Sequence, residues 1–143
     1  MRVDGSCDRR SIRSMRLRLA VLALFLVAVP LASAGLPFKA KLTAPTHTPK
    51  VNTKWRYSVR VTTLKGKPVR ARITVQIADP TGGVHPVQFG STTKDVTNWP
   101  ISGVFRDYVI WPADSREVML KLRVTVKVGA AKKVVQYRVV PRA

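Results

Sequence analysis

The sequence predicts an all-β fold, a single antiparallel sandwich of two sheets with about seven strands, which follows an N-terminal signal peptide. Three observations predict it. Apolar and polar side chains alternate over three long runs, turn residues separate these runs, and helical apolar spacing appears nowhere after residue 34. The hydrophobic fraction of 45% is also too high for a disordered basic tail, so this charged chain has enough apolar surface to fold.

Residues 1–34 form the predicted leader and are set aside before the fold is considered. An uncharged apolar run from residue 19 follows a basic segment, and it ends in Ala32-Ser33-Ala34, a small-x-small cleavage pattern. We expect cleavage after Ala34, which leaves residues 35–143 as the domain. Met15 is an alternative start, because the segment that follows it is a complete secretory signal by itself. The basic segment contains Arg9, Arg10, Arg13, Arg16 and Arg18.

Two alternatives to a cleaved general secretory signal stay open. The uncharged run continues to Phe38, which is long enough for an uncleaved membrane anchor. The pair Arg9-Arg10 also suggests twin-arginine export. In each case the arginines stay inside and the C-terminal part crosses the membrane. We therefore expect the protein to be secreted or held at the cell envelope. The only cysteine, Cys7, leaves with a cleaved leader.

The long strands are predicted by strict alternation. Residues 38–44 carry an apolar side chain at every second position and predict the opening strand. Residues 54–62, 69–78 and 118–128 carry an apolar side chain at every second position, and the positions between them are mostly polar. Such runs bury one face and expose the other, as strands of antiparallel sheets do.

Shorter strands and turns complete the sandwich. Residues 84–89 predict a strand at a sheet edge, because Pro86 donates no ladder hydrogen bond. Residues 103–111 and 133–140 predict two more strands. Glycine and proline mark the joints: residues 64–68 and 79–83 flank one long strand, and Gly129 begins the turn between the last two.

One stretch resembles a known family. The segment YSVRVTTLKGKPVRARITVQIADPTGG is similar to the front half of bacterial immunoglobulin-like and fibronectin type III-like extracellular domains, and the resemblance is mainly over residues 54–90. In those domains a strand, a Gly-x-Pro-Val turn and a second alternating strand run into a hairpin. The resemblance implies an immunoglobulin-like sandwich that acts as an extracellular interaction or spacer module, and it implies no site residue.

The residues that could support catalysis are few and lie in no recognisable motif. Neither a Gly-x-Ser-x-Gly turn, a His-Glu-x-x-His helix nor a phosphate-binding glycine loop occurs. One Cys and two His do not supply the roughly four ligands of a structural zinc site. We therefore expect no enzyme, no metal and no cofactor. The candidates weighed were His47, His85, Ser58, Ser91, Ser102, Ser115 and the acidic residues, including Asp107 and Asp114.

The basic residues are the more informative feature. The chain has 26 Lys and Arg against 7 Asp and Glu, a formal net charge of +19. If the sandwich follows the immunoglobulin order, residues 69–78 and 118–128 are neighbouring strands, and their outward basic side chains form one stripe suited to phosphates, sulfates or uronic acids. The other interpretation, which we favour from the sequence alone, is that these charges only solubilise the outer faces and discourage edge pairing. The proposed polyanion-binding residues are Arg70, Arg72, Lys121, Arg123 and Lys127.

Aromatic side chains gather between residues 99 and 111, with Trp-Pro at both ends. Exposed rings beside a basic sheet stack on sugars, whereas buried rings close the end of a sandwich. Of the two, we expect a core role. The predicted aromatic cluster is Trp99, Phe105, Tyr108 and Trp111.

The sequence leaves two classes of function ahead of an enzyme. The first is an exported, non-catalytic module with a structural or protein-interaction role at the envelope or outside the cell. The second is a polyanion- or glycan-binding module that uses the basic sheet face. The partner classes are an envelope protein, a cell-wall polyanion or a glycan. Export disfavours nucleic acid, and a membrane partner follows only if the leader is an uncleaved anchor.

Overall fold

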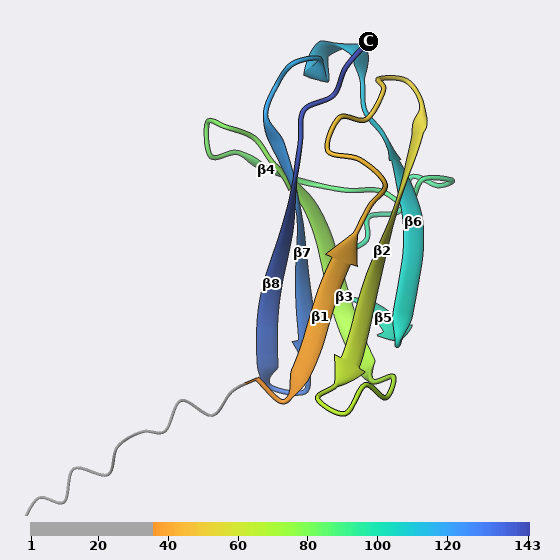
Figure 1. Cartoon of the computed structure of the whole chain (residues 1–143), viewed down its shortest axis with the longest axis vertical. Coiled ribbons are helices and arrows are strands. Elements are labelled where there is room, and N and C mark those ends of the chain that lie inside the picture. The colour runs from red at the N-terminus through yellow and green to blue at the C-terminus, as the bar shows by residue number, and fades with distance from the viewer. Residues whose placement is uncertain (1–35) are drawn as a thin grey trace, which may run out of the picture. The chain divides into compact units, whose positions relative to one another are not determined.

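The computed structural model describes residues 36–143, which form two antiparallel β-sheets packed face to face (Figure 1). The predicted all-β fold and its two-sheet packing are therefore confirmed. The predicted leader, residues 1–34, lies outside the described residues and so does Cys7. The one helical element in residues 36–143 is a short 3₁₀ helix, Ala113–Ser115. No helix of this part is long and apolar enough to cross a membrane.

The three-stranded sheet has the order β1-β2-β6. Its strands are β1 (Phe38–Thr43), β2 (Lys54–Thr63) and β6 (Val104–Ile110). On β2 the aromatic and β-branched residues point inward, with Trp55 and Tyr57 each 3% exposed, as the alternation predicts.

The five-stranded sheet has the order β4-β3-β7-β8, and β5 also pairs with β3. Its strands are β3 (Arg70–Ala78), β4 (Val84–Pro86), β5 (Trp99–Ser102), β7 (Leu120–Val128) and β8 (Ala131–Val139). The short strands β4 and β5 share one edge of β3: β4 pairs with residues 76–78, and β5 pairs with residues 70–73. β4 thus lies at an edge, as Pro86 predicts.

Eight strands are present where about seven are predicted from the sequence. The additional strand is β5, which the sequence pattern hides because Pro100 argues against a strand interior. Gly103 separates β5 from β6 and has a φ of +74°, a conformation that glycine adopts without strain. A Cβ there would lie 2.8 Å from Cβ of Pro68. The chain therefore bends at Gly103 and passes from the five-stranded sheet to the three-stranded one.

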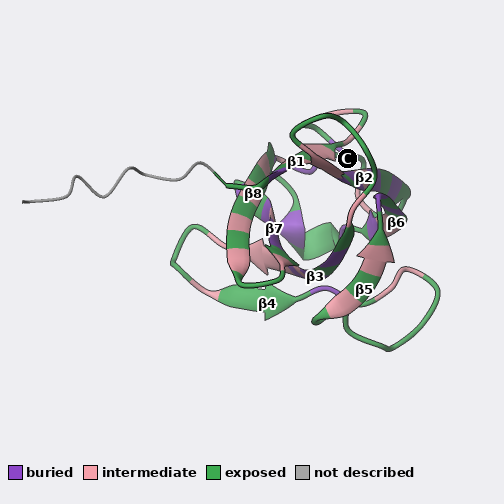
Figure 2. Cartoon of the chain, turned by 90° about the horizontal axis from the view of Figure 1, so that it is seen from below, coloured by how far each residue is buried: buried purple, intermediate pink, exposed green. Residues whose placement is uncertain are grey.

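The core lies between the two sheets, which curve around it when viewed end-on (Figure 2). β7 contributes Leu122, Val124 and Val126, all fully buried, and β2 contributes Val59 and Val61 from the opposite sheet. Each such side chain adds about 1.5–3 kcal/mol of burial free energy. Every second residue of these strands therefore points out to solvent, and those residues form the two outer faces.

Candidate functional site

The structure places the five predicted polyanion-binding residues on one outer sheet face. β3 and β7 are hydrogen-bonded neighbours, and Arg72 lies directly opposite Lys127. Arg123 lies opposite Gln76, and Lys121 lies opposite Ala78. Because the register is antiparallel and in phase, all outward side chains of the two strands share one surface. We call the outward surface of this sheet the five-stranded face.

β8 extends this face by two basic residues that sequence reasoning missed. Lys132 lies opposite Lys127, and Arg138 lies opposite Lys121. Three hydrogen-bonded strands therefore carry a row of three cations, Arg72, Lys127 and Lys132. Residues 132, 134, 136 and 138 are exposed in alternation, but the sequence prediction begins this strand at Lys133, two residues after its actual start at Ala131.

Three of the predicted residues surround an open trough of about 630 Å³. Arg70, Arg72 and Lys127 line it together with Ser102 and Pro100 of β5. We call it the Arg72 trough. β5 is therefore part of the candidate site, because it supplies the wall that β3 and β7 do not.

The guanidinium of Arg72 is held in place by the segment before β5. Its Nη1 donates to the carbonyl oxygen of Asn98 at 3.0 Å. Asn98 has a φ of +51°, and its backbone N–H donates to the Thr74 hydroxyl at 3.0 Å. Asparagine tolerates this left-handed conformation better than most residues. One donor edge of Arg72 is thereby anchored, and its remaining N–H groups are available to an anion.

Lys121 and Arg123 lie farther along β7 and do not line the Arg72 trough. Arg123 is four residues from Lys127, about 13 Å at the usual strand rise of about 3.3 Å per residue. Its side chain is half-buried, and its Nε has no hydrogen-bond partner within residues 36–143. The five predicted residues therefore form a stripe whose basic side chains lie close together at the Arg72 trough and farther apart toward Lys121.

Within residues 36–143, no carboxylate forms an ion pair with the cations of the five-stranded face. Among residues 36–143, ion pairs join Asp79 with His85 and Glu117 with Arg142, and none involves this face. Like charges directly opposite each other destabilise a sheet. The pairs Arg72–Lys127, Lys127–Lys132 and Lys121–Arg138 therefore each cost stability that oppositely charged pairs would not. A bound anion would remove that repulsion.

The predicted aromatic residues do not form one cluster. Trp111 is fully buried and packs edge-on against Trp55, with ring centroids 5.5 Å apart. Trp99 and Phe105 both pack on Phe89, at 4.6 and 5.8 Å. Phe105 and Trp111 are thus core residues, and Trp99 is half-buried against the core.

Tyr108 is the member of the set that reaches the opposite surface. It lies on the outward side of β6, opposite Arg56 of β2. The Lys54 ammonium sits over its ring, 4.9 Å from the centroid. Tyr108 is therefore half-buried on the outer face of the three-stranded sheet, away from the Arg72 trough.

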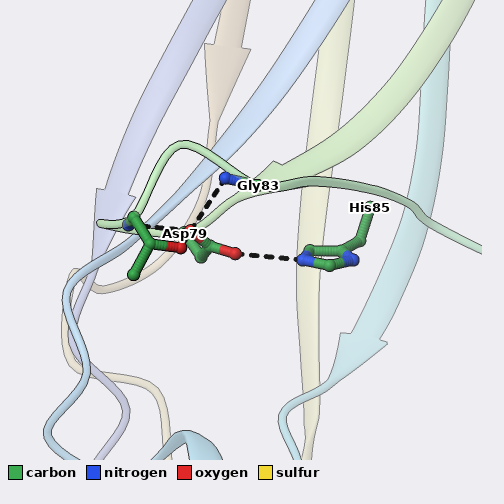
Figure 3. Close-up of polar contacts among 4 residues, drawn as sticks. Asp79, Gly83 and His85 are labelled. Carbon is green, nitrogen blue, oxygen red and sulfur yellow. Dashed lines mark hydrogen bonds and ion pairs between the residues drawn. The ribbon is translucent and has the colours of Figure 1, made fainter.

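One histidine contacts a carboxylate, in the hairpin between β3 and β4 (Figure 3). His85 Nε2 lies 3.1 Å from Asp79 Oδ2. The other oxygen of Asp79 accepts hydrogen bonds from the Thr81 hydroxyl and from the backbone N–H of Thr81 and Gly83. These bonds, the Thr81 hydroxyl first and then His85, hold the pKa of the Asp79 carboxyl well below its usual range.

Within residues 36–143, the His85 imidazole of this Asp–His pair is not hydrogen-bonded to a nucleophile. The nearby Thr81 hydroxyl donates to the carboxylate and not to the imidazole. The arrangement is that of a carboxylate closing a tight turn. The second histidine, His47, stacks on Tyr137 at 4.1 Å, and its Nδ1 bonds to the Arg138 carbonyl oxygen. The part of the chain described by the structure contains no group of three or more possible metal-ligating side chains.

Comparisons with known proteins find a likeness to solved structures and to no described family. No protein-family model matches this chain, and no curated protein matches it. A crystal structure of a DUF4466 family protein from Parabacteroides merdae is similar at a TM-score of 0.40 and 18% sequence identity. The alignment covers 73% of this chain and 43% of that one, so this chain spans less than half of the other protein's length. Likeness at this level supports no conclusion about family or ligand.

Proposed function

We propose that this protein is an exported, non-catalytic immunoglobulin-like module that binds a polyanion through its five-stranded face. The observation that carries the proposal is the row Arg72–Lys127–Lys132, which crosses three hydrogen-bonded strands without an intervening carboxylate. A polymer of phosphates, sulfates or uronates carries anionic groups at regular intervals, so several of them can contact the cations of this row at once. The Arg72 trough gives one anionic group a place where two guanidinium groups converge.

The strand order supports the immunoglobulin-like part of the proposal. In immunoglobulin domains the first two strands share a sheet with a later strand, and the third strand pairs with the last two. Here β1, β2 and β6 form one sheet, and in the other β3 pairs with β7, which pairs with β8. The paired cysteines of antibody domains are absent from the sequence, which has one cysteine.

The leader supports export. Its basic segment, apolar run and Ala32-Ser33-Ala34 motif predict that the mature protein begins at Gly35. N-terminal sequencing or the intact mass of the exported protein tests this. A product that keeps residues 19–34 would replace the cleaved signal with a membrane anchor.

The non-catalytic part rests on the arrangement of the histidines. His85 is engaged by Asp79 in a turn, and His47 is stacked on Tyr137. Within residues 36–143, neither imidazole is hydrogen-bonded to a side-chain hydroxyl or thiol that it could activate as a nucleophile.

The salt dependence of binding tests the polyanion proposal. Binding of long-chain inorganic polyphosphate or dextran sulfate should weaken log-linearly with salt, with a slope near −0.7 to −0.9 per phosphate-like contact. Replacing Arg70, Arg72 and Lys127 together with glutamine should flatten that slope by about two to three units.

A matched control separates this surface from general charge attraction. Lys50, Lys94 and Arg116 are exposed cations in loops, and none lies on either sheet face. Replacing these three with glutamine removes the same charge and should change the slope by less than about one unit. Equal flattening in the two triple variants would refute the proposed site. Binding that depends on neither set and does not respond to salt would favour a protein partner.

A further inference from the structure

The outer face of the other sheet is also basic, although the sequence prediction assigned the anion-binding role to the five-stranded face. Every strand of the three-stranded sheet contributes exposed cations to its outward surface, which we call the three-stranded face. Its basic residues are Lys39, Lys41, Lys54, Arg56, Arg60 and Arg106.

None of the outward-pointing residues of β1, β2 and β6 is acidic. Asp107 of β6 is the acidic residue nearest to this surface in the chain, but Asp107 pairs in register with the buried Tyr57 and lies on the inner side. Its Oδ1 accepts a hydrogen bond from the backbone N–H of Gly90 at 3.2 Å. Lys41 and Arg60 lie directly opposite each other, which repeats the like-charge pairing of the five-stranded face.

The three-stranded face carries a trough of its own, of about 620 Å³. Ser58 lies at its centre, with Thr43 opposite on β1 and Arg106 opposite on β6. Arg56 and Tyr108 form the next cross-strand pair, and the inner-side residues Tyr57 and Asp107 also line the trough. Two guanidinium groups on diagonal positions, with hydroxyl groups between them, suit a phosphate, sulfate or carboxylate group.

The two troughs lie on opposite outer faces and cannot be occupied by one straight segment of ligand. The core lies between the two sheets (Figure 2) and therefore between the two troughs, which are on their outer faces. Packed sheets are about 10 Å apart, and outward side chains add to that thickness. A polyanion chain lying along one face therefore leaves the other face free for a second chain.

We propose that the three-stranded face is a second polyanion-binding surface, so that one molecule bridges two polyanion chains. The inference rests on the proposed function, because it needs the five-stranded face as the other binding surface. The ligand class is the same for both faces: a polymer that carries phosphate, sulfate or carboxylate groups. The consequence is a cross-linking module, whose effect is to gather separate chains.

Light scattering with long-chain inorganic polyphosphate tests the bridging. The purified protein should raise the scattering at intermediate protein-to-chain ratios, and excess polyphosphate should reverse the rise, because each molecule then holds one chain. The variant R56Q/R60Q/R106Q should still bind polyphosphate but lose the scattering rise. The variant R70Q/R72Q/K127Q should do the same. The loop variant K50Q/K94Q/R116Q has the same net charge as the two face variants. Its scattering rise should equal that of the unmodified protein.

The outcomes separate the two proposals. A scattering rise in the R56Q/R60Q/R106Q variant equal to that of the loop variant would overturn the bridging proposal, whatever the other face does. If R70Q/R72Q/K127Q binds as tightly as the loop variant while R56Q/R60Q/R106Q loses binding, the five-stranded face is not the site and the proposed function fails there. Melting temperatures within a few degrees of the unmodified protein check that the outward substitutions leave the fold intact.

Discussion

Tyr57 and Asp107 face each other across β2 and β6 on the inner side of the three-stranded sheet. Neither the Tyr57 hydroxyl nor Oδ2 of Asp107 has a hydrogen-bond partner within residues 36–143, and both atoms are buried. Burial, and secondly the nearby Asp107, raise the pKa of the Tyr57 hydroxyl above its usual range. The pair places two polar atoms in the core beneath the trough of the three-stranded face.

Removing the Tyr57 hydroxyl should not destabilise the protein. An unpartnered buried hydroxyl contributes no hydrogen bond and still costs desolvation, so Tyr57→Phe should leave the free energy of unfolding unchanged or raise it by up to about 1 kcal/mol. Urea denaturation at neutral pH measures this. A loss of more than about 1 kcal/mol would mean that the hydroxyl has a partner in solution.

The raised pKa of Tyr57 predicts a loss of stability at alkaline pH. Above about pH 10, the ordinary tyrosine pKa, the unfolded chain loses the Tyr57 proton while the folded chain keeps it. The folded state then binds more protons than the unfolded state, so the free energy of unfolding falls as pH rises. Urea midpoints of Tyr57→Phe should fall less steeply than those of the unmodified protein over this range. If the urea midpoints of the two proteins fell in parallel as the pH rises, the buried environment assigned to the Tyr57 hydroxyl would be contradicted.

Adjacent residues on β7 should differ sharply in their contribution to stability. Leu122 is fully buried, whereas Lys121 is exposed on the five-stranded face. Leu122→Ala should lower the free energy of unfolding by roughly 2–5 kcal/mol. Lys121→Ala should change it by no more than about half a kcal/mol. Denaturant midpoints measure both, and equal shifts would show that the inner and outer faces of β7 are assigned the wrong way round.

The hairpin carboxylate Asp79 predicts an acid-sensitive contribution to stability. Its hydrogen bonds keep the folded pKa below that of the unfolded chain, about 3.9 for Asp. The stabilisation is therefore fully present above that pH and is lost as the pH falls below it. Asp79→Ala should show a shallower decline of melting temperature between about pH 5 and pH 2. The control is the exposed residue Asp114. If the melting temperature of Asp114→Ala declined with falling pH as little as that of Asp79→Ala, the prediction would be contradicted.

The ring of Tyr108 leaves no room for a side chain at Gly90. A Cβ at position 90 would lie 2.5 Å from Cε2 of that ring, so the alanine variant must displace either the ring or the loop. Gly90→Ala should lower the free energy of unfolding by about 1–3 kcal/mol. The exposed neighbour Ser91→Ala should stay within about half a kcal/mol. Equal denaturant midpoints for the two variants would show that the loop yields without cost.

The candidate surface could be predicted from the sequence only in part. Arg70 and Arg72 were assigned to one outward face because alternation with period two is a local property of each strand. Their meeting with Lys127 depends on β3 pairing with β7, and the chain between these strands contains four other elements. The contribution of β8 was missed because Lys132 joins the face only through its register with Lys127.

The sequence alone was enough to predict seven of the eight strands and the buried side of the long alternating ones, because both follow from the polarity of neighbouring residues. Trp55, Leu122 and Val124 therefore lie where alternation places them. Only the tertiary structure decided that β5 exists, since its backbone is paired by β3 and redirected by Gly103. It also decided that the aromatic residues between 99 and 111 separate, and that cations cover both outer faces. Strand partners and crossover points depend on contacts between distant residues, and a period of two carries no information about them.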